Sequence, residues 1–396
     1  MESTKRLQQA QFDELDDLEQ SFNTCGTLGV IAMKGCEKMG VRINEYLNEF
    51  RYGGAEFGVL TDFLIKSSCP RFRTGEAKAV IEQSFRGHDI FILCDCYNYS
   101  VTYQMYDDVE SYMSPDDHYR DLIRTIAALN GKARRVNVIM PMLYSSRQDN
   151  RTSRESLDCA ISLKELADMG VSNILCFDAH EPRVQNAIPL IGFDTITPSY
   201  QMIKALYDNV EDIELTSDKA LIISPDEGAI DRCLRYSSLL GLDNIGMFYK
   251  RRDYSRVVKG RNPILSHDFI SSPDDVKGKD VIIIDDILAT GESLLEVARK
   301  LHEMGAKRIF TFITFGQFCN GTKLFDQAYA DGVIDKIFVT NTTYKNENII
   351  AKPWFCDVDI SKYLAKIINA LNCDHSISSL LSPIEKVAAL KKRKRI

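Results

Sequence analysis

Residues 281–293 read VIIIDDILATGES, and this stretch restricts the fold more than any other. Four apolar residues precede two carboxylates, and Ala-Thr-Gly-Glu-Ser then leads into a run with apolar periodicity. A short, wholly apolar run is typical of a buried parallel strand, and the periodic run after it is typical of a helix. We therefore predict a strand over 280–284, an acidic pair at its carboxyl end, and a tight turn that opens a helix.

The turn in this stretch has the composition of an anion site. Free backbone N–H groups and the helix dipole favour a phosphate at the start of a helix. Asp285 and Asp286 stand where sugar hydroxyls or a metal ion would lie beside that phosphate. The pattern favours a sugar-phosphate site. The alternative is an ordinary strand–turn–helix with exposed acids, because short Gly/Ser/Thr motifs recur by chance.

Length and composition limit the class of protein. A chain of 396 residues with 44% hydrophobic and 27% charged residues has room for two globular domains. The formal net charge of −7 gives no support for a nucleic-acid partner. No apolar run approaches the roughly 20 residues of a membrane helix, and the first 20 residues lack the apolar core of a signal peptide. The eleven cysteines show no metal-binding spacing, so we expect free thiols and a cytoplasmic location.

Apolar runs alternate between strand-like and helix-like lengths, and the alternation restarts near residue 198. This order predicts an α/β protein with two successive halves, each a parallel sheet flanked by helices. We expect a helix over 198–209 to bridge the halves, a long loop over 97–115, and a disordered basic tail. The predicted divisions are an N-terminal extension at 1–24 with a helix over 12–22, a first domain at 25–197, a second domain at 198–382 and a basic tail at 383–396.

Individual elements are predicted from the same alternation. The expected strands are 28–33, 89–95, 135–140, 172–177, 220–224, 244–249, 280–284, 308–314 and 336–340. The expected helices after the N-terminal extension are 36–50, 116–129, 157–169, 198–209, 229–240, 293–304 and 360–371.

Several polar clusters fall at the carboxyl ends of predicted strands, where ligands bind in open parallel sheets. Arg147, Gln148 and Asp149 precede two further arginines, Arg151 and Arg154. Three arginines within eight residues can grip polyphosphate through forked, charge-assisted bonds. The alternative is a solvated basic loop.

Two clusters have the chemistry of a magnesium site. Asp178 and His180 follow one predicted strand, and Asp226 follows another. Magnesium prefers one or two carboxylates together with phosphate oxygens and water. The alternatives are a locally hydrogen-bonded histidine and an aspartate that complements a helix dipole.

Two more segments suggest nucleotide chemistry. Residues 250–256 carry four cations, and a cationic loop can close over a phosphoryl transition state. Residues 71–76 read RFRTGE, in which Phe72 beside a glycine turn could stack on a base. A solvated charge run and a core phenylalanine are the corresponding alternatives.

In this order, from about residue 28 to 381, the clusters resemble the ribose-phosphate pyrophosphokinase family. The resemblance implies two phosphoribosyltransferase-like domains and a role for each motif. It implies ATP binding by Phe72, Thr74, Glu76, Arg147, Gln148 and Asp149. It implies magnesium at His180, Asp226 and Asp178, and catalysis by Lys250 and Arg252. It implies binding of ribose 5-phosphate by Asp285, Asp286, Ala289, Thr290, Gly291, Glu292 and Ser293.

The family's reaction is transfer of the pyrophosphoryl group of Mg-ATP to ribose 5-phosphate, which gives PRPP and AMP. The resemblance also implies a homo-oligomer built from dimers. This chain departs from the family pattern at Thr74, Ala289, Glu292 and Phe315. A catalytically silent regulatory homologue and a PRPP-consuming phosphoribosyltransferase therefore stand as alternatives. The sequence Ala-Thr-Gly favours the second of these, whereas the motifs of the first half oppose it.

Overall fold

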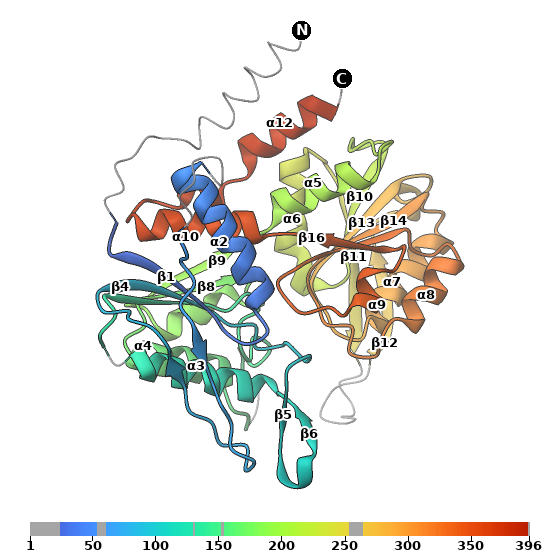
Figure 1. Cartoon of the computed structure of the whole chain (residues 1–396). Coiled ribbons are helices and arrows are strands. Elements are labelled where there is room, and N and C mark those ends of the chain that lie inside the picture. The colour runs from blue at the N-terminus through green and yellow to red at the C-terminus, as the bar shows by residue number, and fades with distance from the viewer. Residues whose placement is uncertain (1–23, 54–60, 130, 152–153, 253–263, 395–396) are drawn as a thin grey trace.

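The chain folds into two large sheets, one parallel and one mainly parallel, and helices cover both faces of each (Figure 1). The computed structural model describes residues 24–53, 61–129, 131–151, 154–252 and 264–394. The expected fold class is confirmed, while the helix expected over 12–22 lies outside the described residues. Within the described residues, no helix has the length and apolar character to cross a membrane.

The first sheet has five parallel strands, each hydrogen-bonded to the next. In spatial order they are β1 (Thr27–Ala32), β4 (His88–Leu93), β7 (Arg135–Ile139), β8 (Asn173–Phe177) and β9 (Gly192–Ile196). Because successive strand residues face opposite sides, Phe91 and Ile92 enter different cores. Both faces of this sheet are therefore buried.

Helices from distant parts of the chain cover the first sheet. One core contains residues of α3 (Pro115–Leu129) and α4 (Asp158–Asp168). The opposite core contains residues of α2 (Glu37–Tyr52) and α10 (Ser361–Asn372), and Arg51 donates 2.7 Å hydrogen bonds to Asn369 and Asn372. By sequence position α10 falls in the predicted second domain, 198–382, but its residues complete this core of the first half.

The second sheet has seven strands. In spatial order they are β12 (Ile264–Ile270), β11 (Ile245–Arg252), β10 (Ala220–Ser224), β13 (Asp280–Leu288), β14 (Arg308–Gly316), β15 (Lys336–Thr340) and β16 (Phe355–Val358). All neighbours are parallel except β11 and β12, which pair antiparallel. One core contains residues of α7 (Glu292–Glu303), α8 (Lys323–Ala330) and α9 (Glu347–Ile350).

The opposite core of the second sheet corrects two predictions. It contains residues of α5 (Ser199–Asn209), α6 (Ile230–Leu240) and α12 (Ile384–Lys394). Helix α5 therefore packs within the second half instead of bridging the halves. The predicted disordered tail is helical from 384 to 394, because Val387 and Leu390 bury their side chains in this core.

Residues 97–115 were expected to be a loop but contain a hairpin. Strand β5 (Thr102–Gln104) pairs antiparallel with β6 (Glu110–Tyr112), and the hairpin projects from the first half (Figure 1). The short η2 (Tyr106–Asp108) closes it. Its base is fixed because Asn98 donates to the Gly35 carbonyl over 3.0 Å and the Asn98 carbonyl lies 2.8 Å from His118 Nε2. A second small ribbon joins β2 (Ser67–Ser68) and β3 (Val80–Ile81), and a single turn forms α11 (Ser378–Leu381).

Candidate active site

The acidic pair lies inside a strand and not after it. Strand β13 continues to Leu288, so Asp285 and Asp286 are both strand residues. The predicted end at residue 284 was wrong because β14 is equally long and keeps the ladder paired as far as Leu288 and Gly316. Asp285 is half-buried and Asp286 is buried.

A cavity of about 430 Å³ opens beside these two carboxylates. Residues from both halves line it, and they belong to four of the predicted clusters. The predicted site residues among them are Arg147, His180, Asp226, Asp285, Asp286, Ala289, Thr290, Gly291 and Ser293. Segments more than 140 residues apart in the sequence therefore meet at one cavity between the two sheets.

One carboxylate oxygen of Asp286 joins the two halves. His180 Nδ1 lies 2.7 Å from Asp286 Oδ2, and Arg232 Nη2 lies 3.3 Å from the same oxygen. Burial would raise the pKa of Asp286, but the His180 hydrogen bond and the Arg232 charge lower it below its ordinary value. Asp286 is therefore ionised, and its hydrogen bond raises the pKa of His180.

Arg232 is a site residue that the sequence reasoning missed. Its side chain is 12% exposed on α6, two residues after the start of that helix. Burial would lower the pKa of Arg232, but Asp286 and Asp178 raise it. Arg232 follows Asp226 by six residues, and Arg235 lies three residues further along the same face of α6. That spacing was the available signal.

Asp285 differs from its neighbour in the direction of its pKa shift. Burial raises the pKa of Asp285 well above its ordinary value, and the Asp286 and Asp226 carboxylates raise it further. The backbone N–H of Asp286 donates to Asp285 Oδ1 over 2.9 Å. Adjacent carboxylates with opposite pKa shifts serve different chemical roles at neutral pH.

The loop after β13 has the geometry expected of a phosphate turn. Gly291 has a φ of 84°, and a Cβ at this position would lie 2.1 Å from the Phe325 ring. Only glycine fits that position without strain. Helix α7 begins at Glu292, so N–H groups of its first turn lack helical partners beside the cavity. Glu292 is exposed and does not line the cavity, so this departure from the family pattern leaves the phosphate turn open.

Of the described residues in the predicted ATP-phosphate segment, Arg147 lines the cavity. Gln148 and Asp149 do not line it; the Gln148 N–H donates to the Ser145 carbonyl over 2.8 Å. Burial raises the pKa of Asp149, while the charge of nearby His180 lowers it.

Asp178 does not line the cavity, which argues against the predicted magnesium role. Its Oδ2 accepts a 2.5 Å hydrogen bond from Thr314 Oγ1, and its Oδ1 lies 3.9 Å from Arg235 Nη1. Burial raises the pKa of Asp178. Its contacts join β8 to β14 and α6, so its observed role is to hold the two halves together.

Three other predicted residues lie outside the cavity. Phe72 is 60% exposed, and its N–H and carbonyl close a turn with Glu76 and Gly75. Thr74 Oγ1 donates to Glu76 Oε2 over 3.1 Å. None of these three predicted ATP-binding side chains reaches the cavity within one copy of the chain.

The two predicted catalytic residues are in a strand. Lys250 and Arg252 belong to β11 and pair with His267 and Ile264 of β12, so the strand extends beyond the predicted end at 249. The rest of the predicted cationic loop, residues 253–256, lies outside the described residues.

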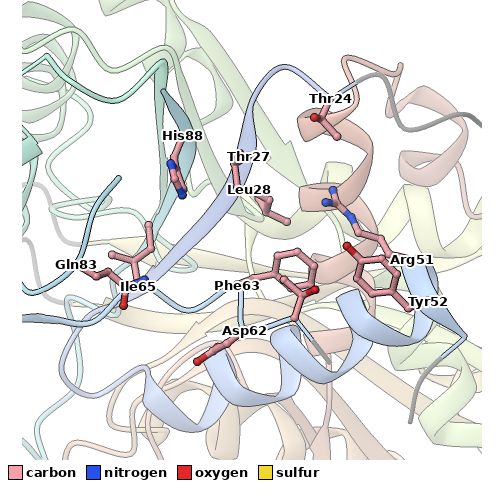
Figure 2. Close-up of a pocket in the computed structure, with 11 residues that line it drawn as sticks. Thr24, Thr27, Leu28, Arg51, Tyr52, Asp62, Phe63, Ile65, Gln83 and His88 are labelled. Carbon is pink, nitrogen blue, oxygen red and sulfur yellow. The ribbon is translucent and has the colours of Figure 1, made fainter. Parts of the chain in front are cut away.

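Another cavity, of about 310 Å³, lies on the first half and holds none of the predicted site residues. Figure 2 shows it between β1 and the end of α2. Arg51 lies over the Phe63 ring at 5.3 Å, and Tyr52 stacks on the same residue at 6.4 Å. These contacts show that Arg51 packs against aromatic side chains of the first half.

Two protein-family models match this chain, one in each half. The family model for the N-terminal domain of ribose phosphate pyrophosphokinase matches residues 28–170. The family model for the phosphoribosyl synthetase-associated domain matches residues 266–382. The chain belongs to the ribose-phosphate pyrophosphokinase family. The two matches together cover most of the chain and include the 71–76 and 147–149 segments and the 285–293 stretch. Asp178, His180, Asp226, Lys250 and Arg252 lie between the two matched regions.

Individual relatives agree with the family assignment. The chain is 26% identical over 320 residues to the ribose-phosphate pyrophosphokinase of Vibrio parahaemolyticus, covering 80% of this chain and 91% of the relative. It is 27% identical over 319 residues to that of Buchnera aphidicola, covering 80% and 90%. The crystal structure of phosphoribosylpyrophosphate synthetase from Mycobacterium smegmatis shares the fold, with a TM-score of 0.68, 20% identity, and coverage of 87% and 98%.

Proposed function

We propose that the chain is a ribose-phosphate diphosphokinase that converts Mg-ATP and ribose 5-phosphate to PRPP and AMP. The observation that carries this proposal is the single cavity in which Arg147, Asp226 and the 289–293 turn meet. A nucleotide-phosphate contact and a sugar-phosphate turn at one cavity suit a reaction between two phosphorylated substrates. Nothing in the comparisons favours a silent homologue or a PRPP-consuming transferase.

The 289–293 turn and the Asp285–Asp286 pair would hold ribose 5-phosphate. Unpaired N–H groups at the start of α7 would bind the 5-phosphate, while Asp285 would bond to sugar hydroxyls. Asp286 Oδ2 already contacts His180 and Arg232, so Asp286 can bond to the sugar less than the resemblance implies. Its second oxygen, Oδ1, accepts the Ile287 N–H over 2.9 Å.

Magnesium is proposed at Asp226 and His180. Among the described residues, no group of three His, Cys, Asp or Glu side chains is arranged to hold a metal ion. A donor set of one carboxylate and one imidazole fits an ion that takes its remaining ligands from phosphate and water. Asp286 bonds to Nδ1 of His180 and leaves Nε2 for the cavity. The ion would neutralise phosphate charge as the β-phosphorus is attacked.

The reaction balances as one displacement. The anomeric oxygen of ribose 5-phosphate forms a bond to the β-phosphorus, and the bond from that phosphorus to the oxygen shared with the α-phosphorus breaks. AMP leaves with the bridging oxygen, and the anomeric hydroxyl proton is released. Positioning and charge neutralisation supply most of the catalysis in such transfers. We assign Arg147 to the triphosphate and Lys250 and Arg252 to the transition-state charge.

The variant Lys250→Ala tests this assignment. Removal of one electrostatic donor typically lowers turnover on the order of a hundredfold or more. We expect that loss in AMP formation, with Mg-ATP binding retained, while Lys164→Ala on the exposed face of α4 keeps wild-type turnover. Near-wild-type AMP formation by Lys250→Ala would refute the role of Lys250.

A homo-oligomer and a cytoplasmic location remain predictions.

A further inference from the structure

The backbone that carries Arg147 forms a tight turn in a strained conformation. The Leu143 carbonyl accepts the Ser146 N–H over 3.1 Å, and Ser145 has a φ of 52°. A residue other than glycine rarely adopts this left-handed conformation, and it stays there only where neighbouring groups fix the backbone. Arg147 itself is exposed, so the turn decides from where its guanidinium reaches the cavity of about 430 Å³.

Two tyrosines hold this turn in place. Tyr144 lies within the turn, stacks on Tyr119 of α3 at 4.2 Å, and donates its hydroxyl to Asp116 over 2.7 Å. The second is Tyr97, whose hydroxyl donates to the Leu143 carbonyl over 3.4 Å. The Leu143 carbonyl is therefore fixed both by its own turn and by a residue of the segment that follows β4.

Tyr97 is held in its turn by the buried carboxylate of Asp95. Asp95 Oδ1 accepts the Tyr97 N–H and Asp95 Oδ2 accepts the Tyr344 N–H, each over 3.0 Å. Burial raises the pKa of Asp95 to about 6, although these two N–H groups and the charge of Lys345 favour its ionised form. Asp95 is therefore ionised at neutral pH, and an ionised acceptor makes stronger hydrogen bonds than a neutral one.

These contacts form one continuous path between the two halves. The path starts at Tyr344 in the loop after β15, passes through Asp95 and Tyr97, and ends at the turn that carries Arg147. Strand β15 belongs to the same sheet as β13, which leads into the 289–293 turn. A misplacement of about 1 Å between reacting groups can cost roughly a hundredfold in rate. The path can thus fix the position of Arg147 relative to the sugar-phosphate turn.

We propose that Asp95 and Tyr97 are positioning residues, which hold residues 143–147 so that Arg147 meets the nucleotide phosphates at a fixed place beside the 289–293 turn. Neither side chain lines the 430 Å³ cavity, so each acts through the turn and not by touching the phosphates. The proposal rests on the function proposed above, in which Arg147 binds the triphosphate. It gives a role to a buried carboxylate that the predicted site does not include.

A double-mutant cycle on Mg-ATP binding tests this proposal. Calorimetric titration of the full chain without ribose 5-phosphate would measure Tyr97→Phe, which loses only the hydroxyl bonded to Leu143. We expect Mg-ATP affinity to fall by about three- to tenfold, the usual effect of losing one hydrogen bond. In the Arg147→Ala background the same substitution should change the affinity by no more than about twofold, because its effect passes through Arg147.

A matched control and a pair of substitutions at Asp95 complete the test. Tyr363→Phe also removes a tyrosyl hydrogen bond to a backbone carbonyl, that of Leu380 at 3.1 Å, and should bind Mg-ATP like the wild type. Asp95→Ala leaves two N–H groups without their acceptor and should lower Mg-ATP affinity by about ten- to a hundredfold. Asp95→Asn keeps a side-chain oxygen and should restore part of that loss.

Equal losses from Tyr97→Phe with and without Arg147 would overturn the proposal, because Tyr97 would then act independently of Arg147. Wild-type Mg-ATP affinity in Tyr97→Phe would overturn it as well, and this variant decides the matter if Asp95→Ala fails to fold. The predicted coupling without any AMP formation would refute the proposed reaction and leave the positioning role intact. Absence of Mg-ATP binding by the wild type would refute both.

Discussion

His180 Nδ1 lies 2.7 Å from Asp286 Oδ2, so a histidine after β8 of the first sheet is bonded to a carboxylate within β13 of the second. Arg232 reaches the same oxygen from α6. This contact fixes which imidazole nitrogen faces the cavity, and it fixes the separation of the two halves at the site.

Asp286→Asn should lower turnover by about ten- to a hundredfold. The amide cannot carry the charge that balances Arg232 and orients His180, and losses of this size are usual when the partner of a ligating histidine is removed. Steady-state AMP formation as a function of magnesium concentration measures the effect, with Asp231→Asn on the exposed face of α6 as the matched control. Equal activity of the two variants would show that the contact has no catalytic consequence.

Gly291→Ala should raise the KM for ribose 5-phosphate more than that for ATP. The left-handed backbone costs a residue with a Cβ roughly 1–2 kcal/mol, and the added Cβ would overlap the Phe325 ring. Gly278→Ala is the control, because its φ of 73° has a similar backbone cost but no atom lies within 4 Å of the added carbon. If both variants keep a wild-type KM for ribose 5-phosphate, the turn is not the phosphate site.

Leu390→Ala should lower the free energy of unfolding by about 2–4 kcal/mol, because it leaves a void where α12 packs on α5 and α6. Lys392→Ala, two residues further along the same helix and exposed, should change it little. Urea unfolding of the full chain measures both. A disordered tail would make the two variants equally stable.

The wild type should show a free energy of unfolding that rises with pH in the alkaline range, and Lys345→Met should abolish this rise. Burial lowers the pKa of Lys345 to about 8 from 10.5. Between these values the unfolded chain holds a proton that the folded chain has released, so the free energy of unfolding rises with pH, by at most about 3 kcal/mol. Urea unfolding at pH 7.5 and 10 should show this rise in the wild type and in the exposed-site variant Lys323→Met. A rise of the same size in Lys345→Met would contradict the assignment.

The sequence predicted the two sheets because their central strands are wholly apolar, as in 281–284 and 90–93. It missed β12, which alternates weakly as an antiparallel edge strand, and β16, in which Asp357 is exposed. It missed α12 because a charge run hides Val387 and Leu390, whose burial depends on α5 and α6. Local pattern carries no information on such distant partners.

The site was predicted as separate clusters, and most of them meet. One cavity is reached by Arg147, His180, Asp226 and the 289–293 turn. Each of them lies at or just after the carboxyl end of a parallel strand, and these ends meet at the same side of each sheet. The direction of a side chain was not predictable. Asp178 turns to Thr314 and Glu292 turns to solvent, because neighbouring elements and not sequence spacing decide where each carboxylate points.

The most direct test of the account uses ribose 5-phosphate labelled with ¹⁸O at the anomeric hydroxyl. The purified chain would be incubated with this substrate, ATP and magnesium, and its products followed by ³¹P NMR. Attack on the β-phosphorus predicts equal amounts of AMP and PRPP, with the label between C1 and the β-phosphorus and none in AMP. Formation of ADP in place of AMP, or no PRPP at any phosphate concentration, would contradict the central claim.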